Sequence, residues 1–221
     1  LLAFALSKIA PGDPAEPDRE QTENANYERT EDIYNQKAAR LGLDKPAFYL
    51  SFLPKAYPDT LYRITKRYHR ENLKKLIAQY GNWPQIQDYY RQLKNFDRSY
   101  ANLPDRLPGN RTELNRSIPE LYTSYKDKKI RSLLGNIEGA INADSTFQAL
   151  LNPAFKLLKE AYETIISGQS THLLYIPAIQ WHGLENQYHK WFSNFITGDF
   201  GISYRNGQPV ADRMKEALFW T

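Results

Sequence analysis

The sequence contains no cysteine and a single methionine, Met214, among its 221 residues. Without cysteine there can be no disulfide framework, no thiolate zinc site and no cysteine nucleophile. No apolar run reaches the roughly 18 residues that a membrane-spanning helix needs. A G-x-S-x-G elbow, a Walker loop and a G-x-G-x-x-G turn are also missing, and with them the usual signatures of acyl transfer, nucleotide hydrolysis and dinucleotide binding. We therefore expect no enzyme, no metal and no cofactor.

The charge of the chain is close to balanced. The 29 basic and 25 acidic residues leave a net charge of +4, and a nucleic-acid-binding protein more often carries a concentrated basic stripe. The densest basic clusters are Lys66-Arg67 with Arg70, and Lys74-Lys75, all on a helical pattern that is typical of a solvated helix face. We expect no nucleic-acid partner, and a polyanion-binding helical module is the first alternative interpretation.

Aromatic residues make up 14% of the sequence, and 16 residues are tyrosines. A tyrosine packs its ring on one side and hydrogen-bonds through its hydroxyl on the other, so this composition predicts a globular fold. Four tyrosines fall on the apolar stripes of predicted helices, where we expect core packing rather than base stacking: Tyr80, Tyr89, Tyr90 and Tyr162.

Apolar residues spaced three and four apart predict a mainly α-helical fold, a helical array or bundle. Gly42 ends a short helix over 31–41, Gly81 ends a second helix, and Gly168 and Gly198 end two later ones. The predicted apolar stripes include Leu73, Leu76, Ile77, Ile86, Leu93, Phe96, Ile130, Leu133, Leu134, Ile137, Ile141, Phe155, Leu158, Ile165, Leu184, Tyr188, Trp191, Phe192 and Phe195.

Three helix starts follow from capping residues. Asn82 is followed by Pro84 in the first predicted turn, and 117–120 reads as a capping box with proline. Asn152-Pro153 predicts the start of a further helix.

Short, dense runs of aromatic and aliphatic residues suggest a small β-sheet. The segments 47–53 and 60–64 fit either a strand or a helix. The segment 173–181 is apolar enough for a buried strand, although Pro177 restricts it to an edge or a break. We expect 47–53 and 173–181 to pair within one compact domain.

The two ends of the sequence carry short apolar stubs, 1–6 and 217–220, and there is no initiator methionine. We expect these stubs to be the truncated ends of two transmembrane helices, which makes the chain a piece of a membrane protein. The segment 11–26 carries three prolines and predicts an extended connector after the first stub. We therefore expect two parts: a membrane-helix stub with its connector over 1–30, and an extracytoplasmic helical domain over 31–221.

One set of residues could hold a metal ion. His182, Glu185 and His189 are spaced i, i+3 and i+7, which would place them on one helix face. The tighter H-E-x-x-H arrangement is missing. A metal-dependent hydrolase using these residues is the second alternative.

Three segments of the sequence resemble the permease subunits of ABC importers for oligopeptides, dipeptides and nickel. Ala10-Pro11-Gly12-Asp13-Pro14 looks like the exit from the first membrane helix of that family, and 41–46 looks like its L-G-L-D-x-P stretch. The third segment, 191–203, is similar to the family's W-x-x-x-x-x-x-G-D-x-G-x-S pattern and continues through R-x-G-x-P-V. The matching loop residues are Gly42, Asp44, Pro46, Gly198, Asp199, Gly201, Ser203, Arg205 and Gly207.

The resemblance implies the first extracytoplasmic loop of such a permease, on the periplasmic side of a bacterial inner membrane. In ordinary members the second and third segments nearly adjoin, so about 52–177 would be an inserted domain. The implied role is docking of a periplasmic solute-binding protein or gating of the pathway. A second permease subunit, ATPase subunits and the membrane would be engaged through the parent protein. Candidate partner-facing residues are Tyr175, Trp181, Tyr188 and Tyr204.

Overall fold

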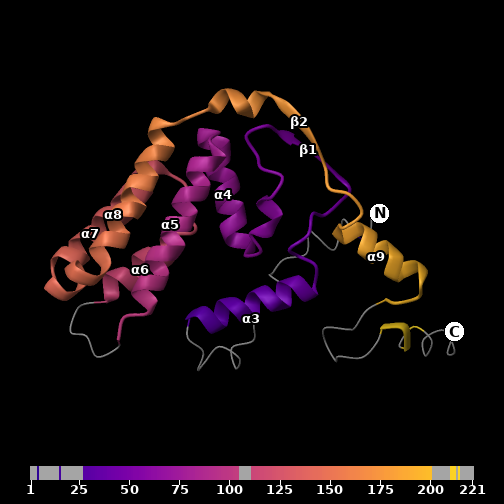
Figure 1. Ribbon diagram of the computed structural model, residues 1–221, viewed down its shortest axis with the longest axis horizontal. Coiled ribbons are helices and arrows are strands. Elements are labelled where there is room, and N and C mark those ends of the chain that lie inside the picture. The colour runs from indigo at the N-terminus through magenta and orange to yellow at the C-terminus, as the bar shows by residue number, and fades with distance from the viewer. Residues whose placement is uncertain are drawn as a thin grey trace. The chain divides into compact units, whose positions relative to one another are not determined.

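The computed structural model describes residues 27–104, 111–200 and 210–212, together with Phe4, Ala15 and Met214. The protein is mainly α-helical with one two-stranded antiparallel sheet (Figure 1), which confirms the predicted fold class. The chain divides into two compact units. Unit 1 consists of 1–12, 45–51 and 180–221, and unit 2 consists of 13–44 and 52–179.

Unit 2 is an array of helices. In chain order its elements are α3 (Tyr27–Arg40), the 3-10 helix η1 (Leu61–Arg63), α4 (Arg67–Tyr80), α5 (Trp83–Ala101), α6 (Thr112–Leu121), α7 (Asp127–Asn142), α8 (Ser145–Ser167) and the 3-10 helix η2 (Thr171–Tyr175). Helix α5 packs along α8, and α7 packs against α6 and α8. The ambiguous segment 60–64 is thus helical in part.

The core of unit 2 lies where the predicted apolar stripes of α5 and α8 meet. Phe96 of α5 and Phe155 of α8 have ring centroids 5.7 Å apart, and Tyr89 and Tyr162 are 5.5 Å apart. All four side chains are at most 2% exposed. Burial of this much apolar area is the main stabilising contribution to the array. Tyr80, Tyr89 and Tyr162 are buried in this core as predicted. Tyr90 is only half-buried.

Three glycines end helices of unit 2 as predicted, and one of them, Gly168, is the C-cap of α8. Gly42 (φ 70°) follows α3, where its N–H donates to the Ala39 carbonyl and the Leu43 N–H donates to the Ala38 carbonyl. Gly81 (φ 71°) follows α4 and donates to the Ile77 carbonyl. Gly42 and Gly81 both adopt the left-handed conformation that glycine enters without steric cost.

One predicted helix start is confirmed and two are wrong. Asn82 occupies the N-cap position of α5, with Pro84 in the first turn as predicted. Its side chain makes no cap hydrogen bond, because its Nδ2 donates to the carbonyls of Ile165 (2.8 Å) and Gly168 (3.0 Å) at the end of α8. Ser117 lies inside α6 and donates to Glu113, so the proposed capping box at 117–120 falls near a helix end. The Asn82 side chain is therefore used in a tertiary contact, and the Ser117 side chain in a hydrogen bond within its own helix.

The other wrong prediction concerns Asn152-Pro153, which lies in the middle of α8. The real cap is Asp144, whose Oδ1 accepts from the N–H groups of Thr146 (2.7 Å) and Phe147 (3.3 Å). Proline usually disrupts a helix interior. Here α8 continues through it, with Leu151 and Phe155 buried on either side.

The sheet joins β1 (Leu50–Pro54) and β2 (Pro177–Trp181), as predicted from the two apolar runs (Figure 1). The Lys55 N–H donates to the Ile176 carbonyl, and the His182 N–H donates to the Tyr49 carbonyl, which fixes an antiparallel register. Pro177 stands at the first position of its strand, where a missing N–H is tolerated. The boundary between the two units crosses this ribbon after Ser51 and before Gln180.

Unit 1 contains the helix α9 (Gln187–Ile196). Its start is capped by Asn186, whose side chain accepts from the His189 N–H at 2.8 Å, and Gly198 (φ 76°) follows its end as predicted. No described helix in either unit is both long enough and apolar enough to span a membrane. The apolar stubs and the connector at 11–26 fall outside the described residues, apart from Phe4 and Ala15.

Candidate partner-binding surface

An aromatic cluster dominates unit 1, with Tyr188 of α9 at its centre. Its ring lies 5.4 Å from Phe4, 5.5 Å from Phe48 and 6.0 Å from Trp191, centroid to centroid. Phe4 also contacts Phe48 (5.3 Å, edge to face) and Trp191 (5.8 Å). The cluster therefore joins three segments that are far apart in the sequence.

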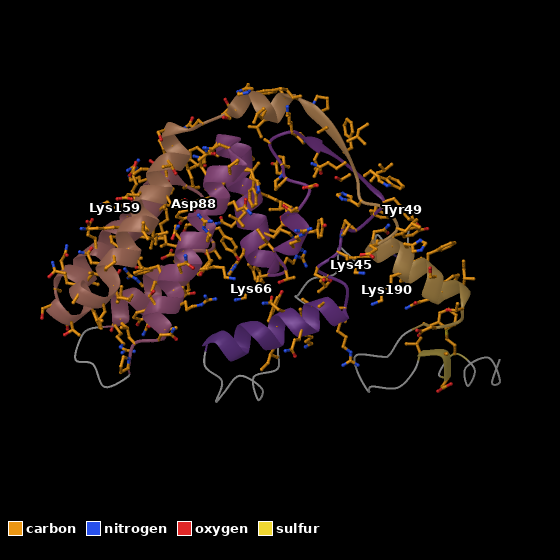
Figure 2. All side chains as sticks on the ribbon, in the orientation of Figure 1. Lys45, Tyr49, Lys66, Asp88, Lys159 and Lys190 are labelled. Carbon is orange, nitrogen blue, oxygen red and sulfur yellow. The ribbon has the colours of Figure 1, made fainter. Side chains whose placement is uncertain are left out.

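Backbone hydrogen bonds set the position of α9 beside the segment 45–51. The Gln187 N–H donates to the Pro46 carbonyl (2.9 Å), and the Tyr188 N–H donates to the Ala47 carbonyl (3.1 Å). Figure 2 labels Tyr49 on this segment and Lys190 on α9. Tyr49 continues the aromatic cluster, because its ring contacts Tyr188 at 6.0 Å and stacks on Trp181 at 6.4 Å.

The outer side of the cluster is exposed and apolar. Helix α9 contributes no buried residue, although Phe192 stacks on Tyr188 (5.9 Å) and Phe195 stacks on Trp191 (5.6 Å). We call the exposed large apolar residues of unit 1 at and near α9 the aromatic face: Trp181 (66% exposed), Leu184 (63%), Phe192 (41%), Phe195 (52%), Ile196 (67%) and Phe200 (39%). Large apolar side chains that are exposed in a group are typical of an interaction surface.

The candidate partner-facing residues have different environments. Tyr175 is 85% exposed and Trp181 66% exposed, whereas Tyr188 is half-buried within the cluster. Tyr204 lies outside the described residues. Sequence reasoning assigned Phe192 and Phe195 to the apolar stripe of α9 but not to an exposed face, because helical periodicity does not indicate whether anything covers the stripe.

The residues proposed as a metal site do not share a helix face. His182 and Glu185 precede α9, and His189 lies in its first turn. The His182 Nε2 is 3.0 Å from the Ser51 hydroxyl, and the His189 Nδ1 is 2.9 Å from the Tyr49 hydroxyl. Among the described residues no group of three histidine, aspartate or glutamate side chains is placed to hold a metal ion.

The loop residues that carry the family resemblance fall on both sides of the unit boundary. Gly42 ends α3 and Asp44 follows it in unit 2, whereas Pro46 is buried in unit 1. Asp199 follows Gly198 after α9, and its N–H donates to the Asn194 carbonyl at 2.8 Å. The other four, Gly201, Ser203, Arg205 and Gly207, lie outside the described residues.

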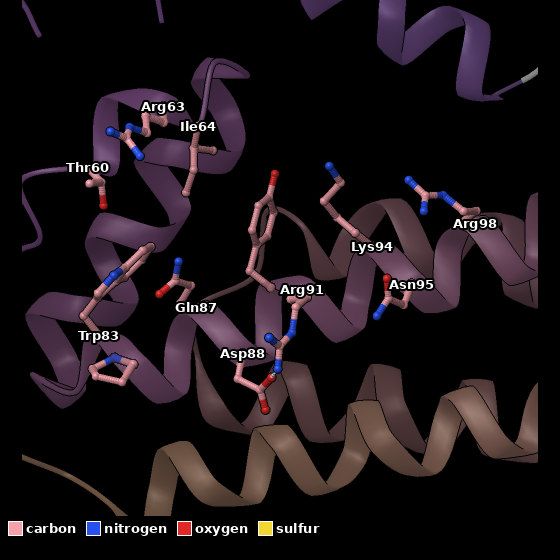
Figure 3. Close-up of a pocket in the computed structure, with 12 residues that line it drawn as sticks. Thr60, Arg63, Ile64, Trp83, Gln87, Asp88, Arg91, Lys94, Asn95 and Arg98 are labelled. Atoms are coloured by element: carbon pink, nitrogen blue, oxygen red, sulfur yellow. Dashed lines mark hydrogen bonds and ion pairs between the residues drawn. The ribbon is translucent and has the colours of Figure 1, made fainter. Parts of the chain in front are cut away.

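Unit 2 carries two adjoining pockets on the side of α5 that faces η1. The larger has a volume of about 580 Å³ and runs along α5 from Trp83 to Arg98 (Figure 3). The second, about 460 Å³, extends toward α3 and includes Asp44 and Lys66. We call the two together the α5 groove, since Arg63, Ile64, Tyr90 and Lys94 line both. Of the basic clusters singled out in the sequence, Lys66 alone lines it.

No family model matches this chain, and neither a curated protein nor a solved structure similar to it was found.

Proposed function

We propose that this chain is the extracytoplasmic domain of a permease subunit of an ABC importer for peptide-type substrates, and that it docks the solute-binding protein. One observation carries the proposal. Phe4 precedes the first family-like segment, Phe48 follows the second, and Trp191 begins the third, and the three aromatic rings pack within one cluster.

This packing supports the resemblance because the three segments were recognised from sequence patterns that place no condition on spatial proximity. The intervening helical array forms a compact unit of its own, whose longer part runs from Phe52 to Ile179. An inserted domain of about 52–177 in a permease loop would have this organisation. The likeness to the family rests on the motifs, and the packing of the Phe4, Phe48 and Trp191 rings in unit 1 supports it.

The docking role rests on the exposed side chains of the aromatic face. Tryptophan and tyrosine are enriched among the residues that contribute most to protein–protein binding, because they bury a large area at small entropic cost. Trp181 is held by its stack on Tyr49 while 66% of it remains exposed. We infer that Trp181 is the anchor of the docking surface, and that ATP hydrolysis is carried out by separate ATPase subunits of the same importer.

The first experiment tests the location of the chain. Because the sequence contains no cysteine, Gln169→Cys introduces a unique thiol into this segment of the parent protein at an exposed position of unit 2. In intact cells of the source bacterium, a thiol reagent that cannot cross the inner membrane should label this cysteine, as read by mass spectrometry of the peptide. Labelling that appears only after cell lysis would exclude an extracytoplasmic location.

The second experiment tests docking. A photo-crosslinking amino acid replaces Trp181 in the complete transporter in cells, and a matched variant carries it at Lys159, an exposed residue of unit 2. We expect the first position, and not the second, to capture a solute-binding protein whose sequence and bound peptide are identified by mass spectrometry. Crosslinking of Trp181 to lipid alone, or to another subunit alone, would contradict the docking role.

A further inference from the structure

The register of the two-stranded sheet decides which backbone groups of β2 point outward. The hydrogen bonds between Lys55 and Ile176 and between His182 and Tyr49 belong to one register, in which Ser51 faces Gln180. The Ser51 hydroxyl donates to the Gln180 Oε1 across this pair, at 3.0 Å. Because bonded and non-bonded pairs alternate in an antiparallel ladder, the N–H and C=O groups of Ile179 and Trp181 point away from β1.

No described residue pairs with these outward groups of β2. The backbone hydrogen bonds outside the helices and the β1–β2 ladder include none to Ile179 or Trp181. The other strand differs, because the start of α9 donates to the carbonyls of Pro46 and Ala47 just before β1. Unpaired backbone groups at the edge of a sheet are a template for a further strand.

The side chains of β2 do not block its edge. Natural edge strands are commonly blocked by lysine, by proline or by a bulge. Strand β2 has no charged residue, and its proline stands at the first position. The register is the same at both ends of the sheet, which leaves no bulge. Ile179 is 72% exposed and Trp181 66% exposed, so the edge combines unpaired backbone groups with accessible apolar side chains.

An extended peptide matches this edge better than a second copy of the chain does. A peptide brings one donor and one acceptor at every non-proline residue, and its alternate residues are about 6.8 Å apart, as they are in β2. In an antiparallel pair of two β2 strands centred on Ile179, the residue opposite Trp181 is Pro177. Proline has no N–H, so the Trp181 carbonyl would stay unpaired.

We propose that the outer edge of β2 binds a short peptide in extended conformation, which adds to the sheet as a third strand. The backbone groups of Ile179 and Trp181 and the carbonyl of Pro177 form the hydrogen bonds, so the backbone of the peptide is recognised rather than a particular side chain. The Trp181 side chain projects from the face of the sheet, whereas its backbone groups point along the sheet plane. Strand addition therefore does not depend on the docking role of that side chain.

The test measures fluorescence anisotropy of a labelled peptide with the complete 221-residue chain. The probe is a blocked pentapeptide of alternating threonine and valine, and the comparison peptide has the same sequence with every backbone nitrogen methylated. We expect saturable binding of the first peptide. The methylated peptide cannot donate to the Ile179 and Trp181 carbonyls and should bind about tenfold more weakly or less well still. Equal binding of the two peptides would overturn the proposal.

Matched proline variants locate the binding edge. Ile179→Pro removes an outward N–H of β2, and Phe52→Pro removes the outward N–H of the residue opposite on β1. Neither group belongs to the β1–β2 ladder, and proline is tolerated at such edge positions. Ile179→Pro should weaken binding about tenfold or more, whereas Phe52→Pro should leave it unchanged. The reverse result would overturn the proposal.

A third variant separates the backbone of Ile179 from its side chain. Ile179→Ala keeps the N–H and should weaken binding about fivefold or less, through the loss of cross-strand side-chain contacts. Circular dichroism spectra and melting temperatures show whether each variant is folded. If Ile179→Pro does not fold, the comparison of the two peptides on the wild-type chain decides the question.

Sedimentation velocity of the chain without peptide distinguishes a peptide from a second copy as the occupant. We expect a monomer at the concentrations used for binding. A dimer that dissociates in the Ile179→Pro variant would assign the edge to a second copy of the chain and overturn the proposal. The absence of saturable binding of the unmethylated peptide up to millimolar concentration would overturn the site itself.

Discussion

The two units of this protein use their aromatic residues in opposite ways. In unit 2, Phe96, Tyr89, Phe155 and Tyr162 are enclosed between α5 and α8 and are at most 2% exposed. In unit 1 the rings contact one another in succession, yet every described residue of α9 keeps some exposure. Ring contacts alone therefore do not define a core, and only enclosure from several sides removes the apolar area from water.

Unit 2 has the enclosed core that a stable fold requires. Unit 1 has an aromatic cluster in which Phe192 and Phe195 of α9 remain 41% and 52% exposed. The four predictions that follow test this difference, from the largest expected effect to the smallest.

The largest difference is expected between two matched phenylalanine truncations. Phe155→Ala in unit 2 removes a ring that is 2% exposed, and it should cost about 3–5 kcal/mol of unfolding free energy through lost burial and a cavity. Phe195→Ala in unit 1 removes a ring that is 52% exposed and should cost less than about 1 kcal/mol. Urea denaturation of each variant measures both. An equal loss of unfolding free energy in the two variants would contradict the difference between the two units.

A second test compares two glycines with positive φ. At Gly81 an added Cβ would lie 2.5 Å from the Ser170 carbonyl oxygen, whereas at Gly198 it would meet nothing within 4 Å. Gly198→Ala should cost about 1–2 kcal/mol for the left-handed backbone alone. Gly81→Ala should cost clearly more, because the turn after α4 must move away from η2.

The control for this test is Gly42→Ala, which lies in unit 2 with φ +70° and open space around the new Cβ. Its cost should equal that of Gly198→Ala. If Gly81→Ala costs no more than Gly42→Ala, measured as the shift in denaturation midpoint, then the close packing of Gly81 against Ser170 is not significant for stability.

The third prediction concerns alkaline pH. Burial raises the pKa of Tyr162 above its usual value of 10, and the hydrogen bond to Asp127 adds to this effect; burial likewise raises the pKa of Tyr89. Above about pH 10 the unfolded chain loses these protons while the folded chain retains them. Their contribution to stability is therefore complete below about pH 9 and is lost as the pH rises past 10.

Denaturation midpoints measured between pH 7 and pH 11 test this dependence. Tyr162→Phe should flatten the alkaline decline and lower stability at pH 7 by about 1 kcal/mol through the lost hydrogen bond. Tyr175→Phe, at a residue that is 85% exposed, should leave the profile of the wild-type chain unchanged. An identical decline in the Tyr162→Phe variant would contradict the assignment.

The smallest effect is expected at a surface ion pair of unit 2. Lys159 Nζ lies 2.8 Å from a carboxylate oxygen of Glu138, and both side chains are nearly half exposed. Lys159→Gln should lower stability by about 0–0.5 kcal/mol, with even this difference reduced at high salt. A loss above about 1 kcal/mol would show that this ion pair contributes more to the stability of unit 2 than an exposed ion pair usually does.

Much of the fold could be predicted because it depends on local signals. Helical periodicity identified the buried stripes of α4, α5, α7 and α8, and glycine identified the ends of α3 and α4. Capping residues were less informative, because asparagine and serine can serve either a helix end or a tertiary contact. Asn82 shows this directly, since its side chain joins the end of α8 to the turn before α5.

The sequence by itself determined the helical class and much of the composition of the core, since both follow from the spacing of apolar residues along the chain. Only the tertiary structure decided which apolar stripes are enclosed and which cations converge. Arg63 and Lys94 line one groove although 31 positions separate them, and Phe192 belongs to a regular stripe that no other described element covers. Burial and convergence depend on the packing of distant segments, which local spacing does not specify.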